Sequence, residues 1–244
     1  MIADRMLHEL RRTIFASVKF AAVETATEWC SVALWLEGEI VSLEHRAGNR
    51  QGEYVLPMLE RLFGRARVGM KDLDAIAFGA GPGAFTGLRI ACGVAQGLAY
   101  AHGLPVIGVS TLEATAEESG AMRALVALDA RMHEVYYAAF EKRAGSWHAV
   151  VAESCVAPDE ADIPPGDGWL GCGSGFSAYG ERLEPRLRGA LARIAPEVRP
   201  SALAVARLAA PRLAAGGGID AALAIPNYIR DKVAMTTAEQ GSKE

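Results

Sequence analysis

The sequence has few cysteines, few aromatic residues and no long hydrophobic run. Its four cysteines are isolated, without a Cys-x-x-Cys pair, which argues against a zinc ribbon and against a disulfide-dense secreted fold. No run of about eighteen apolar residues occurs, and charged residues interrupt the first positions of the chain, so neither a membrane span nor a signal peptide is predicted. We therefore expect a cytoplasmic protein with reduced, mostly buried thiols and no membrane partner.

An excess of positive charge and the common catalytic motifs are also absent. The chain carries 25 Lys and Arg against 29 Asp and Glu, a formal net charge of −4, which disfavours independent binding to nucleic acid. No two of the five histidines lie four residues apart, so a metal site built on a helical His-x-x-x-His motif is excluded. Because of this histidine spacing, the sequence predicts no metal site. A Gly-x-Ser-x-Gly elbow and a Walker A loop are absent as well.

The chain of 244 residues is 51% hydrophobic, which suffices for one large domain or two small ones. Residues 19–46 contain three β-favouring runs separated by turn-like breaks. A helix is predicted from about residue 53 to 65, with Pro57 in its first turn, and then a buried strand and a second helix over 86–101. The first half therefore has the order β-β-β-α-β-α.

A second half begins near Arg123 and repeats strands followed by helices, although no sequence-identical repeat is present. Its last helix is predicted over 201–216 and is expected to be interrupted at Pro211. Strands followed by helices, found twice, predict two related α/β lobes.

The most distinctive segment is the loop GAGPGAFTGLR, residues 79–89, between a predicted buried strand and a predicted helix. Its glycines permit close backbone approach, and free N–H groups at a helix N-terminus attract anions, so a phosphate site is one interpretation. Its spacing matches neither a Walker A loop nor the dinucleotide fingerprint. The spacing favours a structural turn, and phosphate binding remains the alternative.

Few other polar residues lie at the ends of apolar strands, where α/β proteins build their active sites. Glu24, Asp129 and Arg131 do so. They are candidates either for acid–base chemistry or for a structural ion pair. Cys30 follows Trp29 inside a predicted strand, which favours a buried thiol over a nucleophile.

The helix over 86–101 carries Gly93 and Gly97, four residues apart. Each glycine costs a helix interior up to about 1 kcal/mol relative to alanine, so a close neighbour is expected to offset the loss. The glycines share a stripe with Arg89, Gln96 and Tyr100. Packing within the same lobe and contact with a second subunit are equally good explanations of this stripe.

Six segments together carry a resemblance to a known family. In chain order they are AVETATEWCSVALW, YVLPML, GAGPGAFTGLRIACGVAQGLA, PVIGVSTLEA, LDARMHEVYYA and PNYIRDKVA. Over about residues 19–234 the chain resembles the bacterial TsaB proteins, formerly called YeaZ. The block GPGAFTGLR together with IGVSTLEA and DARMHEVY is far more specific than a glycine loop alone.

The resemblance implies a two-lobed, actin-like and ribonuclease-H-like α/β fold. It also implies a part in forming N6-threonylcarbamoyladenosine at position 37 of tRNAs that read codons starting with A. The paralogue TsaD transfers the threonylcarbamoyl group in that pathway, and a TsaB-like chain is its non-catalytic partner. Recruitment of the small ATPase TsaE, a homodimer in the absence of TsaD, and tRNA contact through the assembly are implied as well. No cofactor is expected to bind tightly, and ATP or ADP only in the assembled complex.

Two sets of candidate site residues follow. We place the partner contact on the helices over 52–65 and 86–101, because the first has a broad apolar surface and the second carries the glycine stripe. The candidate interface residues are Tyr54, Leu56, Leu59, Phe63, Arg89, Gly93, Gln96, Gly97 and Tyr100. The candidates for residual nucleotide or anion contacts are Glu24, Thr25, Thr27, Gly81, Gly83, Thr86 and Asp129.

The chain departs from the related families at three places. Glu24 stands where TsaB proteins usually have aspartate, and Ala26 replaces a phosphate-contacting glycine of ATP-hydrolysing relatives, which argues against independent ATP hydrolysis. The helix that carries the metal-binding His-x-x-x-His motif in TsaD reads QGEYVLPML here, without histidine. The alternative function is a weak nucleotide-binding ATPase, or a peptidase-like hydrolase that uses Cys30 and Asp129.

The resemblance also divides the chain. Residues 1–18 have no counterpart in the family and are expected to form a leader. The N-terminal, dimerising lobe is predicted over 19–111 and the C-terminal lobe over 112–236, with a last segment that is free to return to the first lobe. A disordered tail is expected at 237–244.

Overall fold

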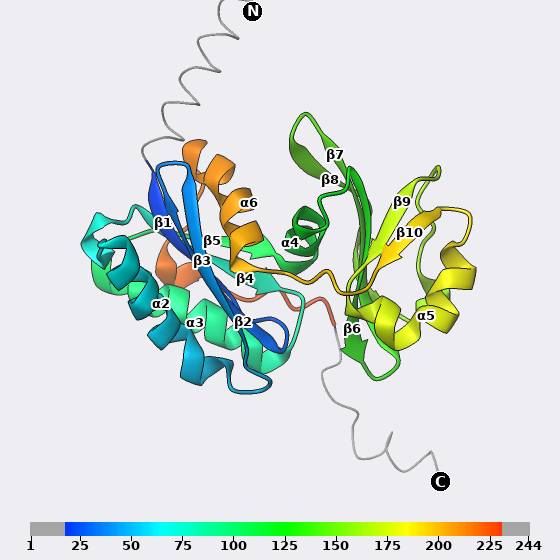
Figure 1. Cartoon of the computed structure of the whole chain (residues 1–244), viewed down its shortest axis with the longest axis horizontal. Coiled ribbons are helices and arrows are strands. Elements are labelled where there is room, and N and C mark those ends of the chain that lie inside the picture. The colour runs from blue at the N-terminus through cyan, green and yellow to red at the C-terminus, as the bar shows by residue number, and fades with distance from the viewer. Residues whose placement is uncertain (1–17, 231–244) are drawn as a thin grey trace, which may run out of the picture.

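The computed structural model describes residues 18–230, which form two α/β lobes side by side (Figure 1). The predicted leader, apart from Val18, and the predicted tail lie outside the described residues. The first lobe is built on a sheet of order β3-β2-β1-β4-β5. Its strands are β1 (Lys19–Glu24), β2 (Trp29–Leu36), β3 (Glu39–Arg46), β4 (Ala75–Gly81) and β5 (Val106–Ser110).

Helices cover both faces of the first sheet. α2 (Gln51–Ala66) and α3 (Phe85–His102) pack on one face, and α6 (Ala202–Ala214) packs on the other. In α2 the buried residues Val55, Leu59 and Leu62 recur at helical spacing, so one side of the helix enters the core. This three-layer arrangement explains why apolar runs such as AIAF in β4 are buried throughout.

The second lobe repeats this design with a sheet of order β10-β9-β6-β7-β8. α5 (Ser174–Leu187) covers one face, and α4 (Thr111–Glu118) covers the other. Its strands are β6 (Arg123–Arg131), β7 (Glu134–Arg143), β8 (Ser146–Val156), β9 (Trp169–Cys172) and β10 (Leu191–Ala195). The short 3₁₀ helices are η1 (Met70–Asp72), η2 (Pro158–Glu160) and η3 (Ala221–Leu223). Among the helices of residues 18–230, none is long and apolar enough to cross a membrane.

The two sheets share one topology. In the first, β1, β2 and β3 are antiparallel neighbours, and β4 and β5 continue parallel to β1. In the second, β6, β7 and β8 are antiparallel neighbours, and β9 and β10 continue parallel to β6. The predicted pair of related α/β lobes is therefore confirmed at the level of strand order.

The division of the chain between the lobes differs from the prediction. α6 falls within the predicted C-terminal lobe of 112–236, yet it packs against β1, β2 and β4 of the first sheet. Its alanine-rich side matches the small side chains of that sheet, among them Ala22, Ala33 and Ala77, so helix and sheet lie close together. The chain after α6 also returns to the first lobe, where Ile219 pairs with Val106 at the edge of β5.

Pro57 and Pro211, for which the sequence made predictions, lie inside helices that continue through them. α2 begins at Gln51, so Pro57 lies in its second turn and not in the first turn as predicted. α6 runs through Pro211 to Ala214, so the interruption predicted there is wrong. Both prolines are exposed, and the core packing of each helix continues on the opposite side.

Candidate functional site

The glycine loop between β4 and α3 packs tightly against the turn between β1 and β2. A Cβ on Gly87 would lie 2.0 Å from the Thr25 carbonyl oxygen, and a Cβ on Gly83 would lie 2.6 Å from the Ala26 Cβ. The Thr25 hydroxyl donates to the Gly87 carbonyl oxygen at 2.7 Å, and the Ala84 N–H donates to the Ala26 carbonyl oxygen at 2.8 Å. The glycines therefore mark backbone contact between two turns, which supports the structural interpretation of the loop.

A cleft of about 620 Å³ lies between the lobes, beside this loop. Its walls come from the β1–β2 turn, the glycine loop, the β6–β7 turn and the C-terminal residues 227–230. Three of the predicted nucleotide or anion contacts line the cleft, namely Thr27, Gly83 and Asp129. The other four do not line it, namely Glu24, Thr25, Gly81 and Thr86. The structure thus brings together only part of the predicted set.

Glu24, at the end of β1, is buried inside the first lobe. Its carboxyl group accepts a hydrogen bond from the Ala26 N–H at 2.6 Å and lies 3.5 Å from the Thr111 hydroxyl. A Cβ on Gly79 would fall 1.9 Å from a carboxyl oxygen of Glu24, so glycine at this position makes room for the carboxyl group. Burial raises the pKa of Glu24 to about 7 against the opposing effect of these hydrogen bonds. The predicted nucleotide contact of Glu24 is therefore corrected to a structural role.

We expect Glu24→Gln to remove a pH-dependent part of the stability. The folded chain keeps the carboxyl proton up to a pKa of about 7, whereas the unfolded chain loses it near the ordinary value of 4.5. The free energy of unfolding therefore falls as pH rises through this window, by roughly 3 kcal/mol from this group, and stays lower above it. Urea unfolding at about pH 5 and about pH 8 measures the difference. An identical pH dependence in parent and variant would contradict the role of this carboxyl.

Asp129 and Arg131 pair with each other at the turn between β6 and β7. The Asp129 carboxylate accepts the Arg131 N–H at 2.7 Å and lies 3.0 Å from the Arg131 guanidinium. The Tyr179 hydroxyl donates to the same carboxylate at 3.1 Å, and the Ser174 hydroxyl oxygen accepts the Asp129 N–H at 3.0 Å. Of the two interpretations of this pair, the geometry favours the structural one.

Cys30 has the surroundings of a structural thiol. The residue is fully buried in the first lobe, and its Sγ contacts the Gln51 carbonyl oxygen at 3.9 Å. Burial raises the pKa of the thiol to about 12, whereas a nucleophilic cysteine needs its thiolate form. Among the residues that the structure describes, no three His, Cys, Asp or Glu side chains are grouped to hold a metal ion. Nothing in this geometry favours the peptidase-like alternative.

The outer face of α2 and α3 carries most of the predicted partner contacts. Leu56 is 51% exposed and Tyr100 is 75% exposed. A Cβ on Gly93 or on Gly97 would meet no atom within 4 Å, so packing inside the described lobe does not offset the helical cost of these glycines. Leu59 is 2% exposed in the core, and its predicted contact with a partner is wrong. The half-buried members of the predicted set on α2 are Tyr54 and Phe63.

Arg89 and Gln96, also predicted to contact a partner, are held by the C-terminal part of the same chain. Arg89 Nε donates to the Tyr228 hydroxyl at 3.2 Å, and Gln96 Nε2 donates to the Ala224 carbonyl oxygen at 3.0 Å. The Arg89 guanidinium also lies 3.7 Å from the centre of the Phe85 ring. The segment after η3 is thus a component of this face, which the sequence did not predict, although PNYIRDKVA is one of the segments that carry the family resemblance.

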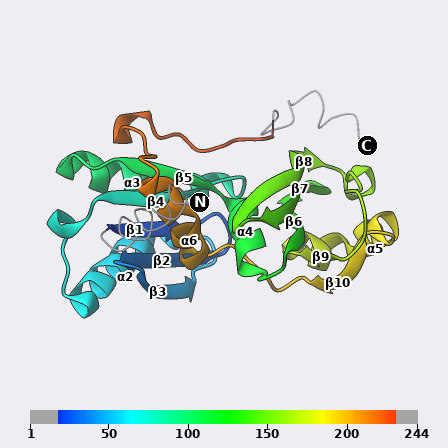
Figure 2. The ribbon, with the colours of Figure 1, turned by 90° about the horizontal axis from the view of Figure 1, so that it is seen from above.

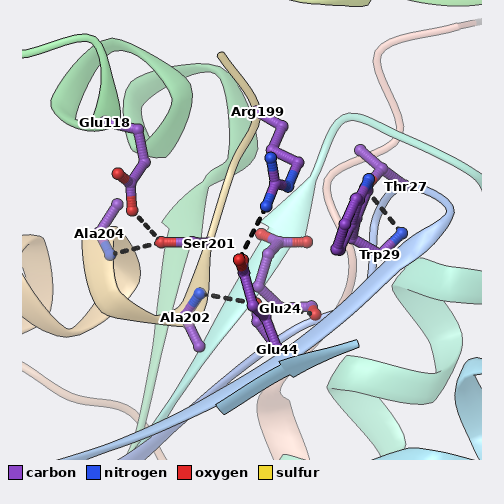
Figure 3. Close-up of polar contacts among 10 residues, drawn as sticks. Glu24, Thr27, Trp29, Glu44, Glu118, Arg199, Ser201, Ala202 and Ala204 are labelled. Atoms are coloured by element: carbon purple, nitrogen blue, oxygen red, sulfur yellow. Dashed lines mark hydrogen bonds and ion pairs between the residues drawn. The ribbon is translucent and has the colours of Figure 1, made fainter. Parts of the chain in front are cut away.

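The connection from β10 to α6 is fixed to both lobes (Figure 3). The Arg199 guanidinium lies 3.8 Å from the centre of the Trp29 ring and 2.8 Å from a Glu44 carboxylate oxygen. Ser201 caps the N-terminus of α6 and donates a hydrogen bond to Glu118 at the end of α4. Residues 196–201 therefore form a well-anchored crossing between the second lobe and the first.

Two lobes of one strand order, joined by crossing segments and separated by a cleft, define the class of two-lobed, actin-like α/β proteins. The family model described as TsaD, tRNA N6-adenosine threonylcarbamoyltransferase, matches residues 45–238. The tRNA threonylcarbamoyladenosine biosynthesis protein TsaB of Escherichia coli (strain K12) is 35% identical over 225 residues, which are 89% of this chain and 96% of that protein. This chain belongs to the TsaB family.

Further comparisons agree with this assignment. TsaB of Haemophilus influenzae is 33% identical over 87% of this chain and 93% of its own length. The structure of YeaZ from Pseudomonas aeruginosa has 38% sequence identity to this chain and a TM-score of 0.80. The match spans 86% of this chain and 99% of the YeaZ chain. A second Pseudomonas aeruginosa structure, described as similar to peptidase YEAZ, is 37% identical, with a TM-score of 0.81, over 87% of this chain and all of that one. The predicted family and two-lobed fold are therefore confirmed.

Proposed function

We propose that this chain is a non-catalytic subunit that supports the threonylcarbamoylation of tRNA by a TsaD-type partner. Its relatives are named for the biosynthesis of threonylcarbamoyladenosine in tRNA, and the matching family model describes the transferase TsaD. The observation that carries the proposal is the open face of α3. Gly93 and Gly97 lower the stability of this helix, and no neighbour in the described chain packs against them. A docked subunit would offset that loss.

We call the outward surface formed by Leu56, Gly93, Gly97 and Tyr100 the docking face. It combines exposed apolar side chains with two positions at which a partner's backbone can approach closely. TsaD is the partner proposed for this face, and a second copy of the chain occupies it when TsaD is absent. TsaE, and ATP or ADP, join only the assembled complex, and tRNA is bound through that assembly.

An accessory role is supported because the ionisable groups predicted for nucleotide contact or hydrolysis, namely Glu24, Asp129 and Cys30, serve internal contacts. Asp129 is paired with Arg131, Glu24 is buried away from the cleft, and the Cys30 thiol has a strongly raised pKa. ATP hydrolysis requires carboxylates or similar groups free to hold Mg²⁺ and to position water. The proposed contribution of this chain is therefore to the structure of the complex and not to the transfer step.

A reconstituted transfer reaction tests the proposal. TsaD and TsaE from the same organism, unmodified tRNA and threonylcarbamoyl-adenylate are incubated with and without this chain, and the modified nucleoside is measured by mass spectrometry. We expect product only when the chain is present, because TsaD would require the docked subunit. The chain without TsaD is the control and is expected to give none. Product from the chain alone would contradict a non-catalytic role.

A further inference from the structure

The C-terminal residues 224–230 pass from the first lobe to the second (Figure 2). The Asn227 N–H donates to the Ala80 carbonyl oxygen of the first lobe at 2.6 Å. The side-chain amide of the same residue lies 3.4 Å from a Glu153 carboxyl oxygen on β8 of the second lobe. Three residues later, Arg230 is bound to the second lobe. The segment thus bridges the lobes and forms part of the cleft wall.

Arg230 binds a site on the second lobe that is formed by Arg131, Glu134 and Tyr136 and is called the socket below. Its Nη2 lies 2.5 Å from a Glu134 carboxylate oxygen and 3.3 Å from the Arg131 carbonyl oxygen, and its guanidinium lies 5.8 Å from the centre of the Tyr136 ring. Its side chain is only 16% exposed. The Glu134 side chain is 39% exposed, so the pair is partly buried, and loss of the carboxylate leaves the shielded guanidinium without its opposite charge. The pair therefore fixes the end of the bridging segment on the second lobe.

The turn between β6 and β7 presents this socket. Arg131, Met132 and His133 have φ angles of 62°, 53° and 61°, three consecutive non-glycine residues in the left-handed region. Such a backbone persists where surrounding contacts over-determine it. Here Asp129 accepts the Arg131 N–H, and Arg230 donates to the Arg131 carbonyl oxygen. The unusual turn and Arg230 thus support each other.

The bridge is separate from the covalent crossings of the fold. Between residues 111 and 201 the chain enters the second lobe through α4 and leaves it through residues 196–201. Figure 2 shows the bridging segment and the latter crossing on opposite sides of α4. Two lobes joined at such crossings can rotate about them, as hinged domains do. A non-covalent tie on the other side restrains that rotation.

We propose that residues 224–230 are a latch, keyed by Arg230 in the β6–β7 socket, that holds the two lobes at one angle and the cleft at one width. The first-lobe end of the latch is fixed by Asn227 on Ala80 and by Gln96 on Ala224. Its second-lobe end is held by the ion pair of Arg230 with Glu134, by the bond of Arg230 to the Arg131 carbonyl oxygen and by the Asn227 amide beside Glu153. Loss of the ion pair between Arg230 and Glu134 releases that end and lets the lobes move apart.

Arg230→Gln and Glu134→Gln test the latch in the full-length chain. Hydrogen–deuterium exchange is expected to become about tenfold faster or more in residues 224–230 and in the β6–β7 turn, since both lose their mutual support. Small-angle X-ray scattering is expected to give a larger radius of gyration. The matched control is Arg182→Gln, which breaks the ion pair of Arg182 with Asp159 within the second lobe and should change neither measurement.

Arg230→Lys provides a milder variant in case the glutamine variants do not fold. It keeps the positive charge but cannot bind the carboxylate and the carbonyl oxygen with the same planar group, so partial loss of protection is expected. Exchange in the β6–β7 turn equal to that of the parent would overturn the proposal. Faster exchange with an unchanged radius of gyration would also overturn it, because the segment would then be a local tether that does not set the lobe angle.

Discussion

Replacing both Gly93 and Gly97 with leucine is expected to weaken association with a TsaD-type partner by about 100-fold or more while the chain stays folded. Both positions lie within α3, and an added Cβ meets no atom of the described chain within 4 Å. Removing glycine from a helix also recovers up to about 1 kcal/mol at each position. On the docking face, in contrast, two leucine side chains would occupy the space that a partner's backbone needs.

Size-exclusion chromatography and calorimetry with TsaD measure the association, and thermal unfolding measures the stability of the variant. Gly189→Leu is a suitable control, because Gly189 is exposed in the second lobe and an added Cβ there also meets no atom within 4 Å. It should leave the affinity unchanged. A folded double variant that binds TsaD as tightly as the parent would show that TsaD does not bind at the docking face.

Gly87→Ala is expected to lower the free energy of unfolding by about 3 kcal/mol or more. The new Cβ would lie 2.0 Å from the Thr25 carbonyl oxygen, which is backbone and cannot turn away as a flexible side chain would. The Thr25 hydroxyl bond to the Gly87 carbonyl oxygen further ties the two segments together. The glycine loop would therefore have to separate from the β1–β2 turn.

Gly93→Ala is the matched control, because the same substitution in the same helix faces open space. It should raise the free energy of unfolding by up to about 1 kcal/mol. Urea unfolding of both variants gives the comparison directly. Equal effects of the two substitutions would show that the loop does not pack on the β1–β2 turn in solution, and its structural role would be refuted.

Local signals in the sequence were sufficient for most elements of the fold. Alternating and continuous apolar runs predicted most strands of the two sheets, although not β10, and helical spacing predicted α2 and α3. The position of α6 was not accessible in the same way. Its alanine-rich pattern predicts a helix, but the choice between two sheets depends on contacts with β1 and β2, far away in the chain. Leu59 failed as an interface residue for a related reason, because a broad apolar helix surface does not reveal which residues enter the core.

The candidate site was predicted less completely than the fold. The residue types of the glycine loop allowed both a phosphate site and a turn, and the close contacts of Gly87 with Thr25 and of Gly83 with Ala26 support the turn. Likewise, a strand-end position suggested that Glu24 faces a site, whereas the missing side chain of Gly79 provides an internal space for its carboxyl group. The Arg230 socket joins positions almost a hundred residues apart and leaves no local pattern to detect.

The decisive experiment on whether this chain acts by docking on TsaD is the reconstituted transfer of the threonylcarbamoyl group to tRNA, with the Gly93→Leu, Gly97→Leu double variant as a third arm. We expect modified tRNA with TsaD, TsaE and the parent chain, and little or none when the chain is omitted or replaced by the folded double variant. Equal product yields in all three arms would contradict the claim that this chain acts by docking on TsaD.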